Sequence, residues 1–336
     1  MITLQGPLYV ALREKMLNFF PERCKCNFKN RLTFSEWLKT GSFTPLLSDG
    51  SRHHFDSYQI DIASVILTEV EFLYNSIFEQ ALELFSISQS TKNRSNAWAV
   101  VSLYYFSFYV VQAYLRLTGN PISFLDSASL SNFNSITSKK LGGGSYILTK
   151  ETDISSTNST YQLRRLDGRF HDSSWRKLFT SIEDLLKTPN AGRIPQELLL
   201  FSSITNKKLH NLYSNYSWPS DVRNKANYRL GFAYLLIEKG SILNICKCIA
   251  QFPKCNDKIE SRLQNALISC HNSNEIKYFD SHVTMLFHVS VGLFQIVKHL
   301  YDDLTSRRHI DRRMHNKREK FVSDIEAQFG KPSFIS

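Results

Sequence analysis

The segment from Asn96 to Gly119, NAWAVVSLYYFSFYVVQAYLRLTG, constrains the fold most, because nothing else in the chain is as long, as apolar and as clearly delimited. Asn96 can cap the first turn of a helix, Gly119 can end the last turn in a left-handed conformation, and Pro121 blocks any continuation. A helix that is apolar on nearly every side is typical of the buried centre of a helical bundle. We therefore expect a central helix here, with the other helices packed around it.

The uncharged part of this segment, Ala97–Leu115, is also long enough to cross a membrane. Polar groups nevertheless recur in it, and one predicted helix face carries a row at spacings of four, three and four residues: Tyr105, Tyr109, Gln112 and Arg116. A second apolar stretch, Val283–Val297, adjoins His282 and includes His288. We favour two core helices and no membrane, with two membrane spans as the alternative.

Helical periodicity recurs through most of the chain. After Ser57, apolar residues at spacings of three and four mark one amphipathic face: Ile60, Ala63, Ile66, Leu67, Val70, Leu73, Tyr74, Ile77 and Phe78. Further helices are predicted over four ranges: Trp175–Leu186, Glu197–Tyr213, Asn224–Glu238 and Ser281–Leu300. Residues 57–238 show no convincing β pattern. The sequence therefore predicts an all-α protein, an up-and-down helical bundle with helical extensions at both ends.

This pattern divides the chain into four parts. Residues 1–56 are an N-terminal helical lead-in, residues 57–240 the bundle, residues 241–306 a C-terminal helical extension and residues 307–336 a basic tail. Ser, Thr, Asn and Gly dominate residues 123–160, and we expect a partly mobile loop there. The three glycines 142–144 within it could instead cradle a phosphate, but the Lys-Ser or Lys-Thr that a P-loop needs does not follow them.

Charge and cysteine content narrow the class of protein. The formal net charge of +11 favours an anionic partner, and nucleic acid is the commonest one for a soluble basic protein, although an acidic protein or a membrane surface would also fit. Six cysteines in 336 residues are too few for a disulfide scaffold. The first residues show no signal peptide. We therefore predict a cytoplasmic protein.

The cysteines and histidines do not predict a metal site. Cys24 and Cys26 are separated by one residue, as are Cys246 and Cys248, and one intervening residue rarely lets both thiolates reach a single zinc ion. Cys255 and the pair Cys270-His271 follow without completing a usual spacing. The pair His53-His54, with Asp56 and Asp61 nearby, is better explained as surface residues of a turn. We predict neither a metal nor a cofactor.

Three stretches together resemble HEPN domains, the all-helical modules of many ribonucleases and toxins in prokaryotic conflict systems. The central helix has the family's form of small and apolar residues around a Tyr-Tyr pair, ending in Leu and Gly. Residues 170–175, FHDSSW, with Phe179 resemble its segment of His, an apolar residue and Phe. Residues 222–228, VRNKANY, resemble its closing Arg-x-x-Ala-Asp-Tyr segment, with Asn227 in place of Asp. The resemblance covers roughly residues 70–240.

This resemblance implies a catalytic pair. HEPN ribonucleases carry Arg and His with four to six residues between them. His helps the 2′-hydroxyl attack the adjacent phosphate without a metal, and Arg stabilises the charge that develops. Arg164 and Arg165 precede His171 at gaps that fit, and Arg223 begins the other motif, in which Tyr228 replaces the terminal His. A tyrosine is a poor base at neutral pH because its pKa is near 10.

Further residues are expected to bind RNA. They are cations near the two motifs and in the C-terminal run, with two other residues of the last motif: Arg169, Arg176, Lys177, Lys207, Lys208, Arg312, Arg313, Asn224 and Tyr228. Structural explanations stay open for the same residues. His171 could be a histidine of a helix start or core, and Arg223 could be an ion-pair residue. The run Arg307–Lys320 could be a soluble helix end or a contact for an acidic protein.

The sequence thus predicts an RNA-acting protein of the HEPN type, a metal-independent endoribonuclease or an RNA-binding effector in a bacterial defence or toxin system. The resemblance also implies a homodimer. The alternative is a non-catalytic helical scaffold that holds a partner protein in a defence complex. The position of His171 separates the two: a cleft within reach of Arg223 favours the enzyme, and burial against apolar side chains favours the scaffold.

Overall fold

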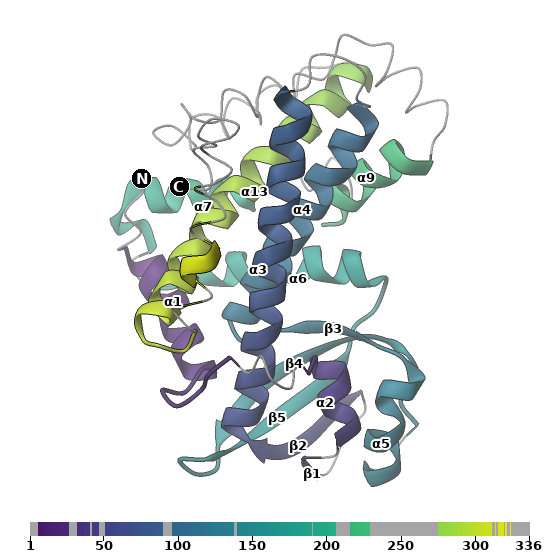
Figure 1. Cartoon of the computed structure of the whole chain (residues 1–336), viewed down its shortest axis with the longest axis vertical. Helices are drawn as coiled ribbons and strands as arrows, with labels where there is room; N and C mark the ends of the chain where they lie inside the picture. Colours follow the sequence, from purple (N-terminus) through teal and green to yellow (C-terminus); the bar gives the residue numbers. More distant parts are fainter. Residues whose placement is uncertain are drawn as a thin grey trace.

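Figure 1 shows a computed structural model of the chain. It describes residues 6–26, 32–40, 42–46, 51–89, 96–137, 140–189, 191–205, 216–228 and 275–310, and after these residues 313, 315–318, 320 and 323. Long helices form the upper part of the molecule in this view, and a β-sheet closes its lower end (Figure 1).

The sheet has five antiparallel strands, so the protein is mixed α/β and the all-α prediction was wrong. The strands lie in the order β1-β2-β5-β4-β3. Their bounds are Thr44–Pro45 (β1), Arg52–Tyr58 (β2), Ile122–Leu125 (β3), Gly144–Asp153 (β4) and Asn158–Arg165 (β5). The histidine pair His53-His54 therefore lies in a strand and not in a turn.

The segment 123–160 is where the sequence misled most. We expected a loop, but it contains most of β3, the helix α5 (Ser127–Thr137), β4 and the start of β5. In β5 burial alternates along the strand, with Ser159, Tyr161 and Leu163 inside. Small and polar residues at the other positions hid this period of two. The buried ring of Tyr161 stacks on the buried ring of Phe55 in β2, which joins the two strands on their inner face.

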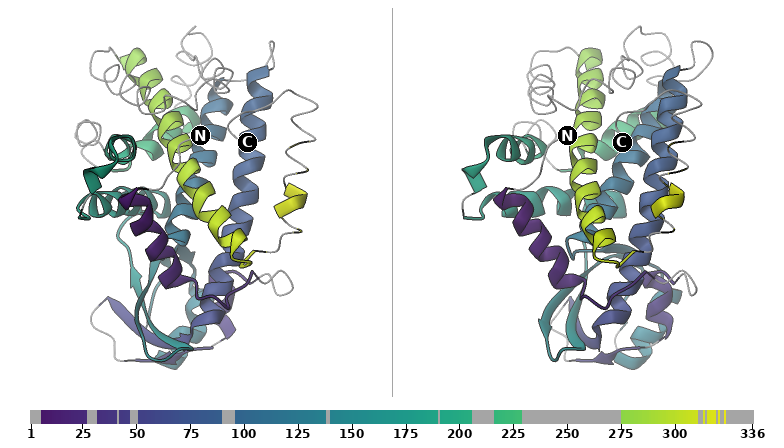
Figure 2. Two further views of the ribbon diagram at one scale, coloured as in Figure 1. Left: turned by 90° about the vertical axis from the view of Figure 1, so that its left-hand side faces the viewer. Right: turned by 60° about the vertical axis from the view of Figure 1, so that its left-hand side comes forward.

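The helices carry most of the core. Their bounds are Pro7–Phe19 (α1), Phe34–Thr40 (α2), Gln59–Gln89 (α3), Asn96–Leu117 (α4), Phe170–Leu186 (α6), Pro195–Ile204 (α7), Trp218–Tyr228 (α9) and Glu275–Ser306 (α13), with a 3-10 turn at Ala191–Arg193. Helix α4 packs against α3, α6, α9 and α13, and the views of Figure 2 show the long helices α3 and α13 rising from the sheet end. The expected central helix is confirmed.

The predicted end of α4 is also confirmed. Gly119 has φ +74°, in the left-handed region, and the N–H of Asn120 donates to the carbonyl of Leu115 (2.8 Å). A Cβ atom at position 119 would lie 3.2 Å from the Phe19 ring, so packing and backbone both favour glycine. Helix α4 and the window His282–Ser306 of α13 are long and apolar enough to cross a membrane, and most of each is buried within this fold. Packing alone therefore accounts for their composition.

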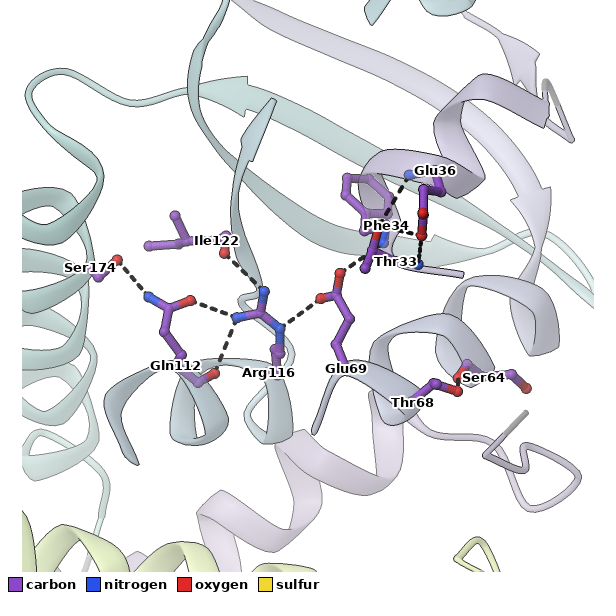
Figure 3. A network of polar contacts seen from close by, with 10 residues as sticks. All are labelled: Thr33, Phe34, Glu36, Ser64, Thr68, Glu69, Gln112, Arg116, Ile122 and Ser174. Carbon is purple, nitrogen blue, oxygen red and sulfur yellow. Dashed lines mark hydrogen bonds and ion pairs between the residues drawn. The ribbon is translucent and has the colours of Figure 1, made fainter. Parts of the chain in front are cut away.

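A buried polar network centred on Arg116 joins the helices to the sheet (Figure 3). Its Nε donates to Glu69 Oε2 of α3 (2.7 Å), one terminal nitrogen donates to Gln112 Oε1 (2.6 Å), and the other donates to the carbonyl of Ile122 in β3 (3.2 Å). Gln112 in turn donates to Ser174 Oγ of α6 (2.7 Å). Both Arg116 and Glu69 are less than a tenth exposed. Two members of the predicted polar row, Gln112 and Arg116, thus connect the central helix to α3, α6 and β3.

The other oxygen of Glu69 reaches the short helix α2. Glu69 Oε1 accepts the backbone N–H of Phe34 (2.8 Å), the first residue of that helix. Thr33 and Glu36 form a capping box at the start of this helix, because Glu36 Oε2 accepts the N–H of Thr33 (2.7 Å) and Thr33 Oγ1 accepts the N–H of Glu36 (3.3 Å). The buried carboxylate of Glu69 therefore links α2 to α3 as well as binding Arg116.

The start of the predicted basic tail is docked through Arg318. Its guanidinium donates to Glu71 Oε2 (2.7 Å), to the hydroxyl of Tyr301 (2.6 Å) and to Asn75 Oδ1 (3.0 Å), and it lies 4.8 Å from the centre of the Tyr74 ring. The hydroxyl of Tyr301 also donates to Glu71. Glu71 is fully buried and Arg318 is 7% exposed. This arginine of the run is therefore a structural residue between α3 and α13.

Candidate functional site

The side chains of His171 and Arg223 meet at Tyr104, where α4, α6 and α9 pack together. His171 Nδ1 lies 2.9 Å from the hydroxyl oxygen of Tyr104, and the guanidinium carbon of Arg223 lies 5.1 Å from the centre of the Tyr104 ring. Tyr104 is fully buried, whereas His171 and Arg223 are partly exposed. Two motif residues far apart in sequence thus share one buried phenol.

Local structure holds His171 at the start of α6. It is the second residue of the helix, which begins at Phe170. Ser173 Oγ donates to the carbonyl of Asp167 (2.9 Å), which ties the first turn to the chain before it, and Ser174 Oγ donates to the carbonyl of Phe170 (2.8 Å). Since Ser174 also accepts from Gln112, the buried network of Arg116 fixes the helix that presents His171.

Aromatic rings surround His171. The centre of its ring lies 4.1 Å from that of Phe108 and 5.9 Å from that of Phe170. The same phenolic oxygen of Tyr104 lies 3.4 Å from the Oγ of Ser220 in α9. The imidazole therefore has one polar anchor at Nδ1 and apolar rings beside it, an arrangement that fixes its orientation.

Burial and charge keep His171 neutral at physiological pH. Desolvation, followed by the positive charge of Arg223, lowers the pKa of His171 to about 4, and the carboxylate of Asp172 opposes the shift only in part. Burial raises the pKa of Tyr104 to about 12, so its phenol stays protonated. If Nδ1–H donates to Tyr104 and the phenol donates to Ser220, Nε2 of His171 keeps a free lone pair. The site then offers one neutral base beside one permanent cation.

This arrangement predicts an acid-sensitive step in stability. The native pKa of His171 lies below its ordinary value of about 6.5, so protons bind more tightly to the unfolded chain. We expect the free energy of unfolding to fall as the pH drops from about 6.5 to about 4. Urea unfolding across this range should show a smaller fall for His171→Gln. Equal falls in both proteins would contradict the lowered pKa.

The two arginines before His171 do not join it. Arg165, at the end of β5, donates to the carbonyl of Gly143 (3.1 Å), so it closes over the glycine-rich turn before β4. The positive charge of Arg164 repels that of Lys177 in α6. This repulsion lowers the pKa of Lys177, although burial has the larger effect. Among the described residues, Arg223 is the arginine that contacts the ring bonded to His171. The spacing of five or six residues therefore did not identify the partner.

The remaining predicted binding residues are dispersed. Asn224 accepts from the neighbouring Arg223 through its Oδ1 (2.8 Å), and so orients that guanidinium. Tyr228 is the last residue of α9. Four predicted cations lie on α6, just before it or in the C-terminal run: Arg169, Arg176 and Arg313 are exposed, and Lys177 is half-buried. Lys207, Lys208 and Arg312 lie outside the described residues.

Tyr104 and Ser220 are site residues that sequence reasoning missed. The resemblance drew attention to the Tyr-Tyr pair, but the polar row assigned to the helix used Tyr105, the half-buried member. Tyr104 and Phe108 are four residues apart, and both contact His171. That spacing on a helix was the available signal. Ser220 carried no signal, because its role depends on how α9 docks on α4.

In the described part of the chain, no group of three or more His, Cys, Asp or Glu side chains is arranged to hold a metal. The thiol of Cys24 lies 3.8 Å from Ser64 Oγ and that of Cys26 lies 3.6 Å from Thr68 Oγ1, and burial raises the pKa of both thiols to about 12. The other four cysteines and His271 lie outside the described residues. His54 pairs with Glu151 (2.8 Å) across the sheet.

Comparison of the chain with family models, with curated proteins and with solved structures found no match. The chemistry of the residues at the junction of α4, α6 and α9 is therefore the ground for a functional proposal.

Proposed function

We propose that the protein acts on RNA as a metal-independent endoribonuclease, with His171 and Arg223 as its catalytic pair. The observation that supports the proposal best is their convergence on Tyr104, with Nδ1 of His171 2.9 Å from its hydroxyl and Arg223 over its ring. Cleavage of a phosphodiester by its own 2′-hydroxyl needs a neutral base and a fixed cation. These two side chains supply that combination.

The proposed chemistry assigns one role to each group. Nε2 of His171 takes the proton from the 2′-hydroxyl as its oxygen attacks the phosphorus atom. The bond from phosphorus to the 5′-oxygen then breaks, and that oxygen receives the proton back from the imidazolium. Arg223 stabilises the negative charge on the phosphorane, and the phenol of Tyr104 orients the imidazole. The products are a 2′,3′-cyclic phosphate and a 5′-hydroxyl.

The low pKa of His171 belongs to the site without a bound anion. A base with a pKa of about 4 is neutral at pH 7 but weak. A phosphate beside Arg223 would offset the smaller cause of this low pKa, the charge of Arg223, and would leave the larger cause, burial, in place. Bound substrate would therefore raise the pKa of His171 only in part.

Cleavage by the purified protein tests the proposal. The wild type is incubated with total RNA and with tRNA in EDTA, beside His171→Ala and Arg223→Ala. We expect fragments from the wild type and a loss of about 10²–10⁴-fold in rate for each variant, the range typical of general acid–base and electrostatic catalysis. Mapping the fragment ends should show cyclic phosphates.

Two variants outside the site serve as controls. His54→Gln removes a histidine that pairs with Glu151, and Arg193→Gln removes an exposed arginine of the 3-10 turn. Both should cleave like the wild type. Cleavage that EDTA abolishes, or that persists in His171→Ala, would refute the proposed mechanism.

One observation favours a non-catalytic scaffold as the second candidate. The ring of His171 packs 4.1 Å from that of Phe108, a contact typical of a histidine that supports a helix junction. In that case the protein binds RNA or a partner protein without cutting it. Absence of cleavage by the wild type, together with RNA binding at low salt, would select this function.

A further inference from the structure

A second group of cations comes from the paired strands β2 and β5 and from the helices α6 and α1, which pack on each other. Arg52 of β2 and Arg164 of β5 are directly paired residues in adjacent antiparallel strands. Paired residues of this kind project from the same side of a sheet, with Cβ atoms about 5 Å apart. The pairing therefore sets two arginines side by side, an arrangement that like charges normally disfavour.

Two lysines extend this pair. Helix α6 packs on both β4 and α1. Lys177 of α6 is half-buried, and the positive charges of Arg164 and of Lys15 in α1 lower its pKa after the larger effect of burial. Arg164 is half-buried as well, whereas Arg52 and Lys15 are exposed. We name these four residues, Lys15, Arg52, Arg164 and Lys177, the basic patch.

Acidic side chains do not neutralise the basic patch. Within the described residues, none of its four members forms an ion pair. The carboxylate of Asp184 acts on both Lys177 and Lys15, but it is bound to Lys187 (2.7 Å). The carboxylate of Glu151, near the arginine pair, is bound to His54 and Gln162. Four cations from four elements thus outnumber these two acids, in a chain whose net charge is already +11.

We infer that the basic patch binds the phosphate backbone of single-stranded RNA, at a site separate from the His171–Arg223 pair. The identity of the ligand rests on the proposed RNA function, but the site does not depend on catalysis. Arg164 and Lys177 are recessed relative to Arg52 and Lys15. A flexible chain of phosphates can follow such a surface, whereas a flat membrane reaches only protruding groups. The anion also relieves the repulsion between the paired arginines.

Binding of a fluorescent oligouridylate tests this inference, measured by anisotropy over a range of salt concentrations. All variants carry His171→Ala, so that cleavage cannot interfere. We expect Arg164→Gln with Lys177→Gln to weaken binding at least 10-fold at low salt. The slope of log affinity against log salt should fall by about 0.7 for each phosphate that the variant no longer neutralises. The charge-matched control is Lys39→Gln with Arg193→Gln, two exposed cations elsewhere, and it should bind like the parent.

Thermal unfolding separates a binding role from a structural one. Removing one of two paired like charges should leave the melting temperature of Arg164→Gln unchanged or higher, and oligouridylate should raise the melting temperature of the parent more than that of the variant. Equal affinity and equal salt slope in the patch variant and the parent would overturn the inference. The inference would also be overturned if the parent binds anionic vesicles but not oligouridylate, and if the patch substitutions abolish the vesicle binding. Normal patch-dependent binding without cleavage by the wild type would refute only the proposed nuclease.

Discussion

Replacing Arg116 with methionine is expected to lower the free energy of unfolding by about 3–5 kcal/mol, because the substitution leaves the carboxylate of Glu69 buried without its cation. Arg116 and Glu69 are 2.7 Å apart, and their side chains are 8% and 10% exposed. The same arginine also bonds Gln112 and the carbonyl of Ile122. Urea unfolding followed by circular dichroism measures the loss.

The effect should depend on the charge that is left behind. Arg116→Met combined with Glu69→Gln keeps an acceptor for the N–H of Phe34 and removes the buried charge, so we expect it to be less destabilised than Arg116→Met alone. Arg13→Met is the matched control: Arg13 pairs with Asp303 at 2.9 Å, but its side chain is 41% exposed. An exposed pair contributes about 1 kcal/mol or less. Equal losses for Arg13→Met and Arg116→Met would contradict a special role for the buried network.

A loss of activity should accompany the loss of stability at Arg116. Gln112 connects this network to Ser174, which lies three residues after His171 on α6. A displacement of α6 would move the imidazole away from the hydroxyl of Tyr104, which orients it. Under the proposed function, Arg116→Met should therefore reduce cleavage even at temperatures where the variant is fully folded.

Replacing Arg318 with alanine is expected to cost about 3–5 kcal/mol as well, and to release the C-terminal segment from α3 and α13. Glu71 is fully buried, and among the described residues the hydroxyl of Tyr301 is the partner that it keeps in this variant. The substitution also removes the donors to Tyr301 and Asn75 and the cation above the stacked rings of Tyr74 and Tyr301, whose centres are 4.0 Å apart.

Urea unfolding and limited trypsin digestion test this result together. The run 307–320 contains many lysines and arginines, so trypsin should cut it faster in Arg318→Ala than in the wild type. Arg318→Lys should lie between the two, because one ammonium cannot reproduce three donors in a fixed plane. Lys317→Ala, at an exposed neighbouring position, is the control and should behave like the wild type. A wild-type digestion pattern in Arg318→Ala would show that Arg318 does not hold the segment.

Prediction of the site from sequence was partial. His171 and Arg223 were both predicted from their motifs, and the structure brings them to one phenol. Arg164 and Arg165 were chosen because they precede His171 at a suitable spacing, yet both lie at the end of β5, before the turn that leads to α6. Arg165 bonds the carbonyl of Gly143 instead. Spacing along the chain fails there because a strand and a helix with a turn between them do not share one face.

The sequence by itself determined the helices whose signals are local. The central helix, its glycine end at Gly119, and the capping box of Thr33 and Glu36 depend on residues within about four positions of one another, so they can be recognised without knowledge of the fold. Apolar periodicity likewise predicted the long helix α3. The residues that define each of these elements lie within the same stretch of chain.

Only the tertiary structure decided the sheet, the docking of the C-terminal segment and the partners of the buried charges. Strand β2 pairs with β5, about a hundred residues later, and the polar residues of β5 become a strand because that pairing satisfies their backbone. Arg318 binds Glu71, which lies 247 positions earlier in the chain. Such contacts cannot be recognised in a short stretch of sequence. The partner of a buried polar residue is determined by packing between segments that are distant in the chain.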